Sequence, residues 1–286
     1  MPAQSGAKVP TPVPSPRFPK TVPVYFRRAK DRLVHITLSI AHRPDSFREV
    51  LNALPGNQVN LLAVNISNGA HEGFAEGHIF AEIDPSLSPK ELEEKLRRVP
   101  AVRHVRVQPD LEGRLIDDSH PLRVSEAGRV LLFSQASFAS ALNRMRDAMG
   151  PGGSVLLYDF GQHMGEELVA EASRAFGVDF VRANLGYSLR FFSAMGWGQI
   201  ELVEADVGQG HFRLLVRESF ECFRAEGAKV PRAQLIRGMF AGTFAGLVGA
   251  PVSCTETKCI AQGDPYCEFE VDRVPSKSAD ELVLPG

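Results

Sequence analysis

The feature that most constrains the fold is a cysteine-rich stretch near the C-terminus, which holds three of the four cysteines of the chain. Two strand-like runs flank a turn at Gly263-Asp264-Pro265. Residues two apart on a strand share a face, so Cys254 and Glu256 point the same way, and the turn returns Cys267 towards Cys259. Thiolates and a carboxylate in one place suit zinc, which takes four ligands. We therefore predict a zinc site at Glu256, Cys259, Cys267 and Cys254; the alternative is that the cysteines are small buried apolar residues.

The bulk properties of the 286 residues are those of an ordinary globular protein with room for two domains. The net charge of −2 argues against a chain built to coat nucleic acid. The sequence shows neither a leader pattern nor a run of about 18 apolar residues that could span a membrane. Four cysteines in such a chain favour metal or free thiols over disulfides. We therefore expect a cytoplasmic protein with no direct nucleic-acid partner and no membrane association.

The first 110 residues divide into a proline-rich tail and a regular βαββαβ pattern. Residues 1–30 are rich in proline, which interrupts helices and central strands, so we predict a disordered tail there. The pattern then predicts an antiparallel sheet with two helices on it, a ferredoxin-like domain over residues 31–110. The expected strands are Arg32–Ile40, Val59–Ser67, Gly77–Ile83 and Val102–Val107, and the expected helices begin at Asp45 or Ser46 and at Ser88-Pro89.

This arrangement resembles an ACT-type regulatory domain. The resemblance implies that the turn after the first strand holds a ligand or takes part in dimerisation. Here Ala41-His42-Arg43-Pro44-Asp45 replaces the glycine-bearing turn of such domains. We expect His35, His42 and Arg43 to be strand or surface residues rather than ligands. Pairing of two such sheets predicts a homodimer.

Residues 111–126 hold turn-forming residues, and we predict a linker there. A second domain is expected over residues 127–273, followed by a tail over 274–286. Its expected helices run from Ser134 or Ser137 to Met149, from Gly161 to Phe176 and from Gln234 to Val248; its expected strands are Val155–Tyr158, Gln199–Ala205 and His211–Arg217. Glycines at Gly165 and along the last helix predict close approach of a neighbouring backbone.

The second domain resembles a 4-vinyl reductase domain over residues 127–273. The ordered motifs are Glu256-x-x-Cys259-(x7)-Cys267, followed by Glu-Phe-Glu-Val, and upstream Gly153 to Tyr158, Met195-Gly-Trp-Gly198, Glu218-Ser219 and Gly238 to Gly249. The resemblance implies an α/β fold related to a subunit family of vesicle-tethering complexes, so that the whole chain is α+β. It also implies binding of small hydrophobic molecules, as in the phenol-sensing domains of bacterial transcription regulators.

The resemblance also implies a structural zinc ion. Its ligands would be Glu256, Cys259, Cys267 and an earlier cysteine, and that earlier position falls at Ala233 in this chain. The fourth ligand is therefore open between Cys254, Cys222 and water, and a site without metal is a further possibility.

An apolar stripe in the second domain could hold the hydrophobic ligand. We predict Tyr158, Tyr187, Phe191, Met195 and Trp197 as ligand-binding residues, although such a stripe is more often part of a core. Further polar candidates for anchoring the ligand are His163, Asn184 and Arg217.

No dinucleotide fingerprint, phosphate-binding loop or nucleophile elbow is present in the sequence, and we predict no catalytic residue. These features favour a non-enzymatic small-molecule sensor or regulator. Because no helix-turn-helix is evident, any role in transcription regulation would pass through a protein partner. The alternative function is an accessory protein or reductase acting on a tetrapyrrole.

Overall fold

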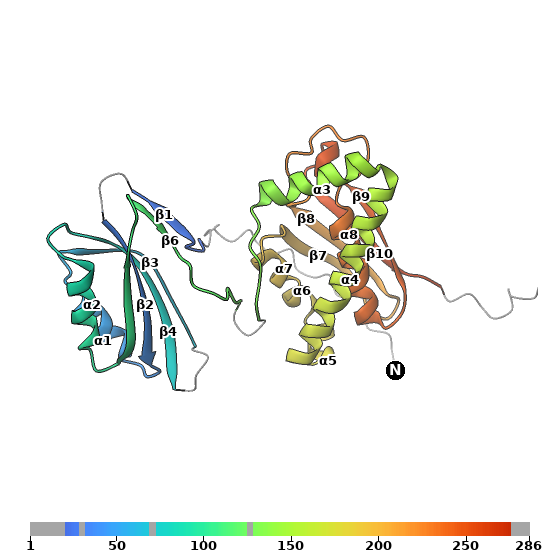
Figure 1. Cartoon of the computed structure of the whole chain (residues 1–286). Coiled ribbons are helices and arrows are strands. Elements are labelled where there is room, and N and C mark those ends of the chain that lie inside the picture. Colours follow the sequence, from blue (N-terminus) through green and yellow to red (C-terminus); the bar gives the residue numbers. More distant parts are fainter. Residues whose placement is uncertain (1–20, 29–31, 69–72, 125–127, 276–286) are drawn as a thin grey trace, which may run out of the picture. The chain divides into compact units, whose positions relative to one another are not determined.

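The computed structural model describes residues 21–28, 32–68, 73–124 and 128–275, which form two compact units divided between Leu131 and Leu132 (Figure 1). Most of the predicted proline-rich tail and all but two residues of the predicted C-terminal tail lie outside these ranges. No helix in the described ranges is both long and apolar enough to cross a bilayer.

The N-terminal unit is built on a four-stranded antiparallel sheet in the order β3-β4-β2-β5 (Figure 1). Alternation of apolar and polar residues along each strand produces this sheet, because one face is buried and the other is more open. The predicted order βαββαβ is confirmed. The strands are β2 (Arg32–Ala41), β3 (Val59–Asn68), β4 (Phe74–Ile83) and β5 (Val102–Pro109).

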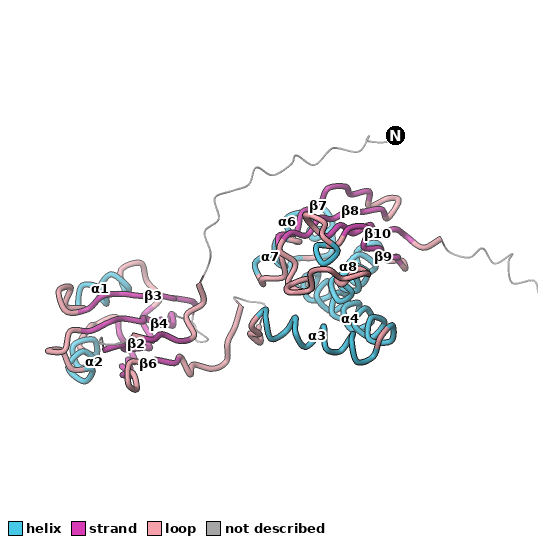
Figure 2. The backbone as a smooth tube through the Cα atoms, turned by 90° about the horizontal axis from the view of Figure 1, so that it is seen from above, coloured by secondary structure: helices cyan, strands magenta, loops and turns pink. Residues whose placement is uncertain are grey.

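Two helices, α1 (Ser46–Ala53) and α2 (Pro89–Arg97), cover one face of this sheet (Figure 2). Helix α2 begins with a capping box, in which the Ser88 hydroxyl accepts a hydrogen bond from the Glu91 N–H and the Glu91 carboxylate accepts one from the Ser88 N–H. Its apolar side then buries Leu92 and Leu96 against the strands. Local sequence signals therefore account for this layer.

The other face of the sheet is partly covered by a short antiparallel pair, β1 (Tyr25–Arg27) and β6 (Arg114–Ile116). Strand β1 falls within the predicted tail and β6 within the predicted linker. Leu115 of β6 joins Leu33 and Phe80 of the sheet in a small separate core. His35 lies on this face and is buried, although it was expected to be a strand or surface residue.

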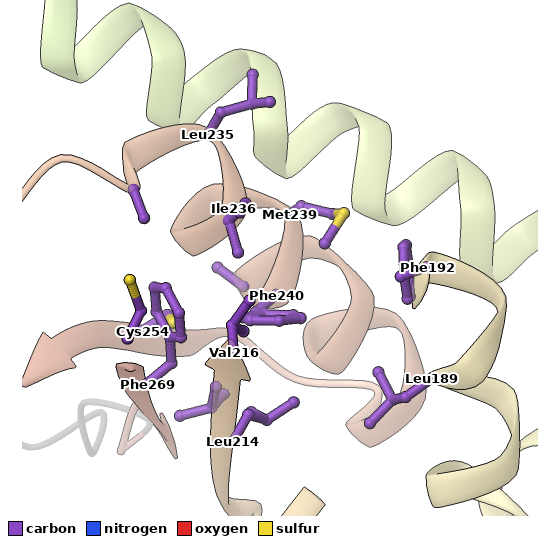
Figure 3. Close-up of a cluster of buried hydrophobic side chains, with 14 of the residues drawn as sticks. Leu189, Phe192, Leu214, Val216, Leu235, Ile236, Met239, Phe240, Cys254 and Phe269 are labelled. Carbon is purple, nitrogen blue, oxygen red and sulfur yellow. The ribbon is translucent and has the colours of Figure 1, made fainter. Parts of the chain in front are cut away.

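The C-terminal unit has its own antiparallel sheet in the order β7-β8-β10-β9. Helix α8 (Gln234–Val248), whose predicted bounds are confirmed, lies between this sheet and helix α4 (Figure 3). Both sides of α8 are therefore buried, which explains why its sequence lacks a polar face. The strands are β7 (Gln199–Asp206), β8 (His211–Arg217), β9 (Val252–Lys258) and β10 (Cys267–Arg273).

Helix α4 (Pro151–Phe176) differs from prediction, because the expected strand Val155–Tyr158 is part of it. Pro151 occupies the first turn of the helix, where proline is tolerated, instead of ending the preceding segment. The apolar run is a helical stripe, in which Leu157 is buried while Val155 and Leu156 are exposed. The remaining helices are α3 (Gln135–Met149), α5 (Val178–Ala183), α6 (Leu185–Ser188) and α7 (Arg190–Ala194).

Helices α4 and α8 touch backbone to backbone. A Cβ atom added at Gly161 or Gly165 of α4 would overlap a carbonyl oxygen of α8, and one added at Gly238 or Gly242 would overlap a carbonyl oxygen of α4. The predicted close approach at these glycines is confirmed. The two helices can therefore pack at this distance only while these positions carry no side chain.

Candidate metal centre

Four buried side chains converge at one end of the C-terminal sheet: Cys222, Glu256, Cys259 and Cys267. Cys222 lies in the loop between β8 and α8, and Glu256 lies on β9. Cys259 follows the end of β9, and a short 3-10 helix (Ile260–Gln262) and a turn lead from it to Cys267, the first residue of β10. One ligand atom from each of the four lies within 4.8 Å of the others.

The spacing of the sulfur atoms suits a shared metal ion. Cys222 Sγ lies 3.7 Å from Cys259 Sγ and 3.6 Å from Cys267 Sγ. All three cysteines are free thiols. Two thiolates on a tetrahedral zinc ion, with zinc–sulfur bonds of about 2.3 Å, lie about 3.8 Å apart. The sulfurs are therefore spaced as ligands of one ion are spaced.

Backbone groups around the cluster are placed to orient its ligands. The Arg232 N–H donates to Cys259 Sγ and the Ile260 N–H to Cys267 Sγ, each at 3.4 Å. The Ala233 N–H donates to Glu256 Oε2 at 3.1 Å. Such outer contacts are typical of metal sites, where they fix the geometry of the ligands.

Glu256 carries an oxygen that the described protein does not satisfy. Its Oε1 atom is buried without a hydrogen-bond partner among the described residues. Burial raises the pKa of Glu256 to about 9, and the neighbouring Cys259 adds to this increase. A buried carboxylate with a free oxygen, beside three thiols, is a donor set that a cation would complete.

The three thiols share one acidic position. Hydrogen bonds from Cys222 and Cys267 lower the pKa of Cys259, and the Arg232 N–H adds to this decrease. The same hydrogen bonds hold the pKa of Cys267 above its usual range, and the one between Cys222 and Cys259 does so for Cys222. Negative charge in the metal-free cluster is therefore concentrated on Cys259, and a divalent ion would allow all three thiols to ionise.

The structure does not bring Cys254 into this group. Cys254 and Glu256 do point to the same face of β9, but two residues along a strand are about 6.8 Å apart. Cys254 instead points towards α8, beside Phe269 (Figure 3), and packs in the apolar core. Cys222 reaches the cluster from the other side. Of the candidates for the fourth position, the geometry favours Cys222 over Cys254.

A second buried carboxylate, Glu221, lies next to the cluster. Its two oxygens accept hydrogen bonds from the N–H groups of Leu235 and Ile236, each at 2.9 Å, at the first turn of α8. Arg146 of α3 forms an ion pair with it and also donates to the Arg232 carbonyl. Burial raises the pKa of Glu221 to about 7, and Arg146 and the two N–H groups oppose that increase. The sequence analysis missed this pair.

An apolar groove lies between α3 and α4 in the same unit. Its volume is about 560 Å³. Phe138 in its wall stacks on Phe220 with ring centroids 5.6 Å apart, and Phe220 contacts Trp197 edge-on. The residues around the groove are Phe138, Leu142, Met145, Leu156, Leu157, Asp159, Phe160 and His163.

The predicted ligand-binding residues are spread over several elements. Trp197 reaches the groove wall through Phe220, whereas Tyr158 lies under the guanidinium of Arg237, 4.6 Å from it. Tyr187 and Phe191 are exposed on α6 and α7, and Met195 is half-buried at the end of α7. Their role in ligand binding stays a prediction. Phe138 and Phe220 were missed as possible pocket residues because their contact joins segments more than 80 residues apart.

Comparison with known proteins identifies part of this unit. Residues 212–273 match the family model of the 4-vinyl reductase domain. An uncharacterized protein of Methanocaldococcus jannaschii is 27% identical over 169 residues, which covers 59% of this chain and 89% of that protein.

Two solved structures also resemble this unit. The phenol-responsive sensory domain of the transcription activator PoxR, solved with phenol, has a TM-score of 0.43 and 20% identity over 51% of this chain and 77% of that one. A vinyl-4-reductase family protein of Methanocaldococcus jannaschii has a TM-score of 0.36 and 18% identity over 51% and 85% of the two chains.

The matched residues 212–273 run from β8 through α8 to the end of β10, and they include all four residues of the cluster. The C-terminal unit of this chain therefore contains a 4-vinyl reductase domain.

Proposed function

We propose that the C-terminal unit is a non-enzymatic sensor module, which binds a small hydrophobic molecule in the groove between α3 and α4 and is held in shape by a structural zinc ion. One observation carries this proposal. Phe220, Glu221 and Cys222 are consecutive, and they contact the groove wall, the N-terminus of α8 and the cysteine cluster in turn. A metal ion that fixes Cys222 would thus fix the aromatic ring that supports the groove.

The donor set favours zinc over harder ions. Three thiolates are soft ligands, and with one carboxylate they complete a four-coordinate site with no position left for a substrate. Closed sites of this type stabilise folds instead of activating water. When bound, the ion would supply charge neutralisation for the buried thiolates and carboxylate. The chain's own contribution is to hold the four ligands and donate N–H groups to them.

The groove has the character of a site for a small apolar or aromatic ligand. Its volume falls within the usual range for small-molecule sites, and most of its lining side chains are apolar. Asp159 and His163 lie at the groove and could hydrogen-bond a polar group of the ligand, such as a phenolic hydroxyl. The phenol held by the PoxR sensory domain is a ligand of this chemical class.

The N-terminal unit supplies the regulatory half of the proposal. We infer that its ACT-like fold mediates dimerisation or receives a second signal, and that the sensor acts in the cytoplasm through a protein partner. Ligand binding can shift such a system only if the ligand has different affinities for its two states.

The test measures metal, ligand and catalysis on the full-length protein. Native mass spectrometry should find zinc bound to the purified chain. Phenol titration, followed by fluorescence of the single tryptophan, Trp197, should saturate without turnover. Leu156→Asp should weaken phenol binding about tenfold or more, equal to about 1.4 kcal/mol, because it places a charge in the groove. Val155→Asp is the matched control, since Val155 is exposed beside the groove and does not line it.

Three results would contradict the proposal in different ways. Equal binding by both variants would exclude the groove, and a loss caused instead by Tyr187→Ala would favour the predicted residues around α6. Purified protein that contains no metal would exclude the zinc ion. A copurified tetrapyrrole, or reduction of its vinyl group, would favour the accessory or reductase function.

A further inference from the structure

Two histidines and an aspartate converge in the N-terminal unit, on the sheet face that the helices leave open. His35 lies on β2 and His78 on β4. In the register of these strands His78 is opposite Thr37, so the two histidines are diagonal neighbours on one face. Asp117 follows directly after β6. Ligand atoms of the three residues lie within 4.8 Å of one another.

His35 is built into this site and does not merely face it. It is only 1% exposed, and its ring stacks on Phe80 with centroids 4.4 Å apart. Its Nε2 atom lies 3.2 Å from His78 Nδ1, and its Nδ1 atom lies 3.7 Å from Asp117 Oδ1. Packing therefore holds the imidazole of His35 in one plane between the other two groups.

The hydrogen bonding of His35 is incomplete. Its Nδ1 atom is buried without a hydrogen-bond partner among the described residues. A neutral imidazole carries one donor and one acceptor nitrogen. If Nε2–H donates to His78, the lone pair of Nδ1 faces the Asp117 carboxylate; if Nδ1 carries the proton, 3.7 Å is too long for a hydrogen bond to Asp117. A cation beside Nδ1 would satisfy both that lone pair and the carboxylate.

Asp117 is held in place by two backbone contacts. Its N–H donates to the Val24 carbonyl, and its Oδ1 accepts a hydrogen bond from the Ser119 N–H, both at 2.9 Å. The carboxylate is therefore positioned by the ends of the β1–β6 pair before any ion binds. Little ordering of this ligand would be needed on binding.

We propose that His35, His78 and Asp117 form a second metal site, which binds a divalent transition-metal ion such as Zn²⁺, Co²⁺ or Ni²⁺. Imidazole nitrogens and one carboxylate are ligands that these ions accept. Burial lowers the pKa of His35, which keeps the imidazole in its neutral, metal-binding form; Asp117 and Asp118 oppose that decrease, and His78 and Arg106 add to it.

This site differs from the cysteine cluster in its chemistry. It has three protein ligands and no thiolate, so at least one coordination position stays open. We expect the ion to exchange more readily than one held by three thiolates and a carboxylate. Bound metal would join β2 and β4 to the segment that leaves β6. The site would thus let the N-terminal unit respond to transition-metal concentration, independently of the groove in the other unit.

Cobalt titration of the metal-free, full-length protein tests this site separately from the cluster. A cobalt ion in the cysteine cluster produces a sulfur-to-cobalt charge-transfer band, whereas one bound by imidazoles and a carboxylate does not. We expect two ions per chain, one for each group of ligands. His78→Gln should remove the ion without the sulfur band and leave the other, since His78 is only half-buried and its replacement should not unfold the sheet.

His104→Gln is the matched control, because His104 is an exposed histidine on the same face of the same sheet. Asp117→Asn should weaken the same ion without removing a buried ring. The proposal is overturned if the wild-type protein binds cobalt only with the sulfur band, or if His104→Gln and His78→Gln lower the cobalt stoichiometry equally. Unchanged melting of His78→Gln in the absence of metal shows that any loss of cobalt is a loss of ligand.

Discussion

Both units place helices on a four-stranded antiparallel sheet, but different contacts hold the layers together. In the N-terminal unit, α1 and α2 bury one apolar side each, and Leu92 and Leu96 pack on the strands. In the C-terminal unit, α8 is buried on both sides, and it meets α4 through backbone atoms at its glycines. Its first turn is bound by two buried carboxylates.

The difference lies in how much one atom matters. Side-chain packing can adjust to small changes, since neighbouring side chains repack. Backbone contact, an ion pair in the interior and a set of metal ligands cannot adjust in this way. We therefore expect single substitutions to destabilise the C-terminal unit more than the N-terminal one, and the following predictions test that expectation in order of decreasing effect.

Loss of a cluster ligand should have the largest effect. Structural zinc contributes on the order of 10 kcal/mol to folding in small domains. Cys222→Ser should remove most of that contribution, because Cys222 lies within 3.7 Å of two other cluster sulfurs. Cys254→Ser should cost only about 1 kcal/mol, the ordinary effect of a point substitution. Zinc content and thermal melting of both variants, with and without a chelator, measure this; equal loss of zinc in both would show that Cys254 is a ligand.

Arg146→Met should have the next largest effect. It leaves the carboxylate of Glu221 buried without its charged partner, which should lower the free energy of unfolding by about 3–5 kcal/mol. Arg144→Met on the exposed side of α3 is the control and should change it by no more than about 0.5 kcal/mol. Urea unfolding compares the two; a small loss for Arg146→Met would mean that Glu221 takes up a proton and stays buried at little cost.

A methyl group at the α4–α8 contact should cost about 3 kcal/mol. In Gly238→Ala the added Cβ overlaps the Tyr158 carbonyl oxygen, so the helices must separate. Gly77→Ala in β4 is the counterpart in the N-terminal unit, where the nearest atoms belong to Leu38 at an ordinary 3.6 Å. Unfolding of each variant, followed by hydrogen exchange in the separate units, gives the comparison. Equal costs would remove the distinction drawn between the two units.

The smallest effect is expected at the N-terminus of α2. Ser88→Ala removes the cap and should cost about 1 kcal/mol. Lys90→Ala, at an exposed position of the same first turn, should be nearly neutral because alanine is a good helix former. If Ser88→Ala destabilised the protein as much as Arg146→Met does, local signals would matter more in the N-terminal unit than its packing suggests.

The same contrast explains what could be predicted from the sequence. The βαββαβ order follows from alternation along strands and from a local cap such as Ser88, both of which act over a few residues. Helix α8 was also predicted within its bounds. The strand expected at Val155–Tyr158 was wrong, because a short apolar run fits a buried strand and a helical stripe equally well.

The candidate site was predicted only in part, for a related reason. Glu256, Cys259 and Cys267 are close in sequence, so a turn and two strands were enough to place them together. Cys222 comes from a loop 37 residues before Cys259, and no local rule brings it there. The contact between Arg146 and Glu221 spans 75 residues and was missed entirely. The sequence signal for it was a glutamate beside a candidate ligand, before an otherwise apolar helix.

The start of α8 has a consequence for how this unit comes apart. Amide hydrogens of Ala233, Leu235 and Ile236 are all donated to side chains of Glu221 and Glu256, which belong to segments on either side of the helix. Helix ends usually fray, and their amides exchange with solvent early. Here the end of the helix cannot fray until both acids have moved away. We expect these three amides to exchange as slowly as those at the centre of α8, and to be released only when the whole unit unfolds.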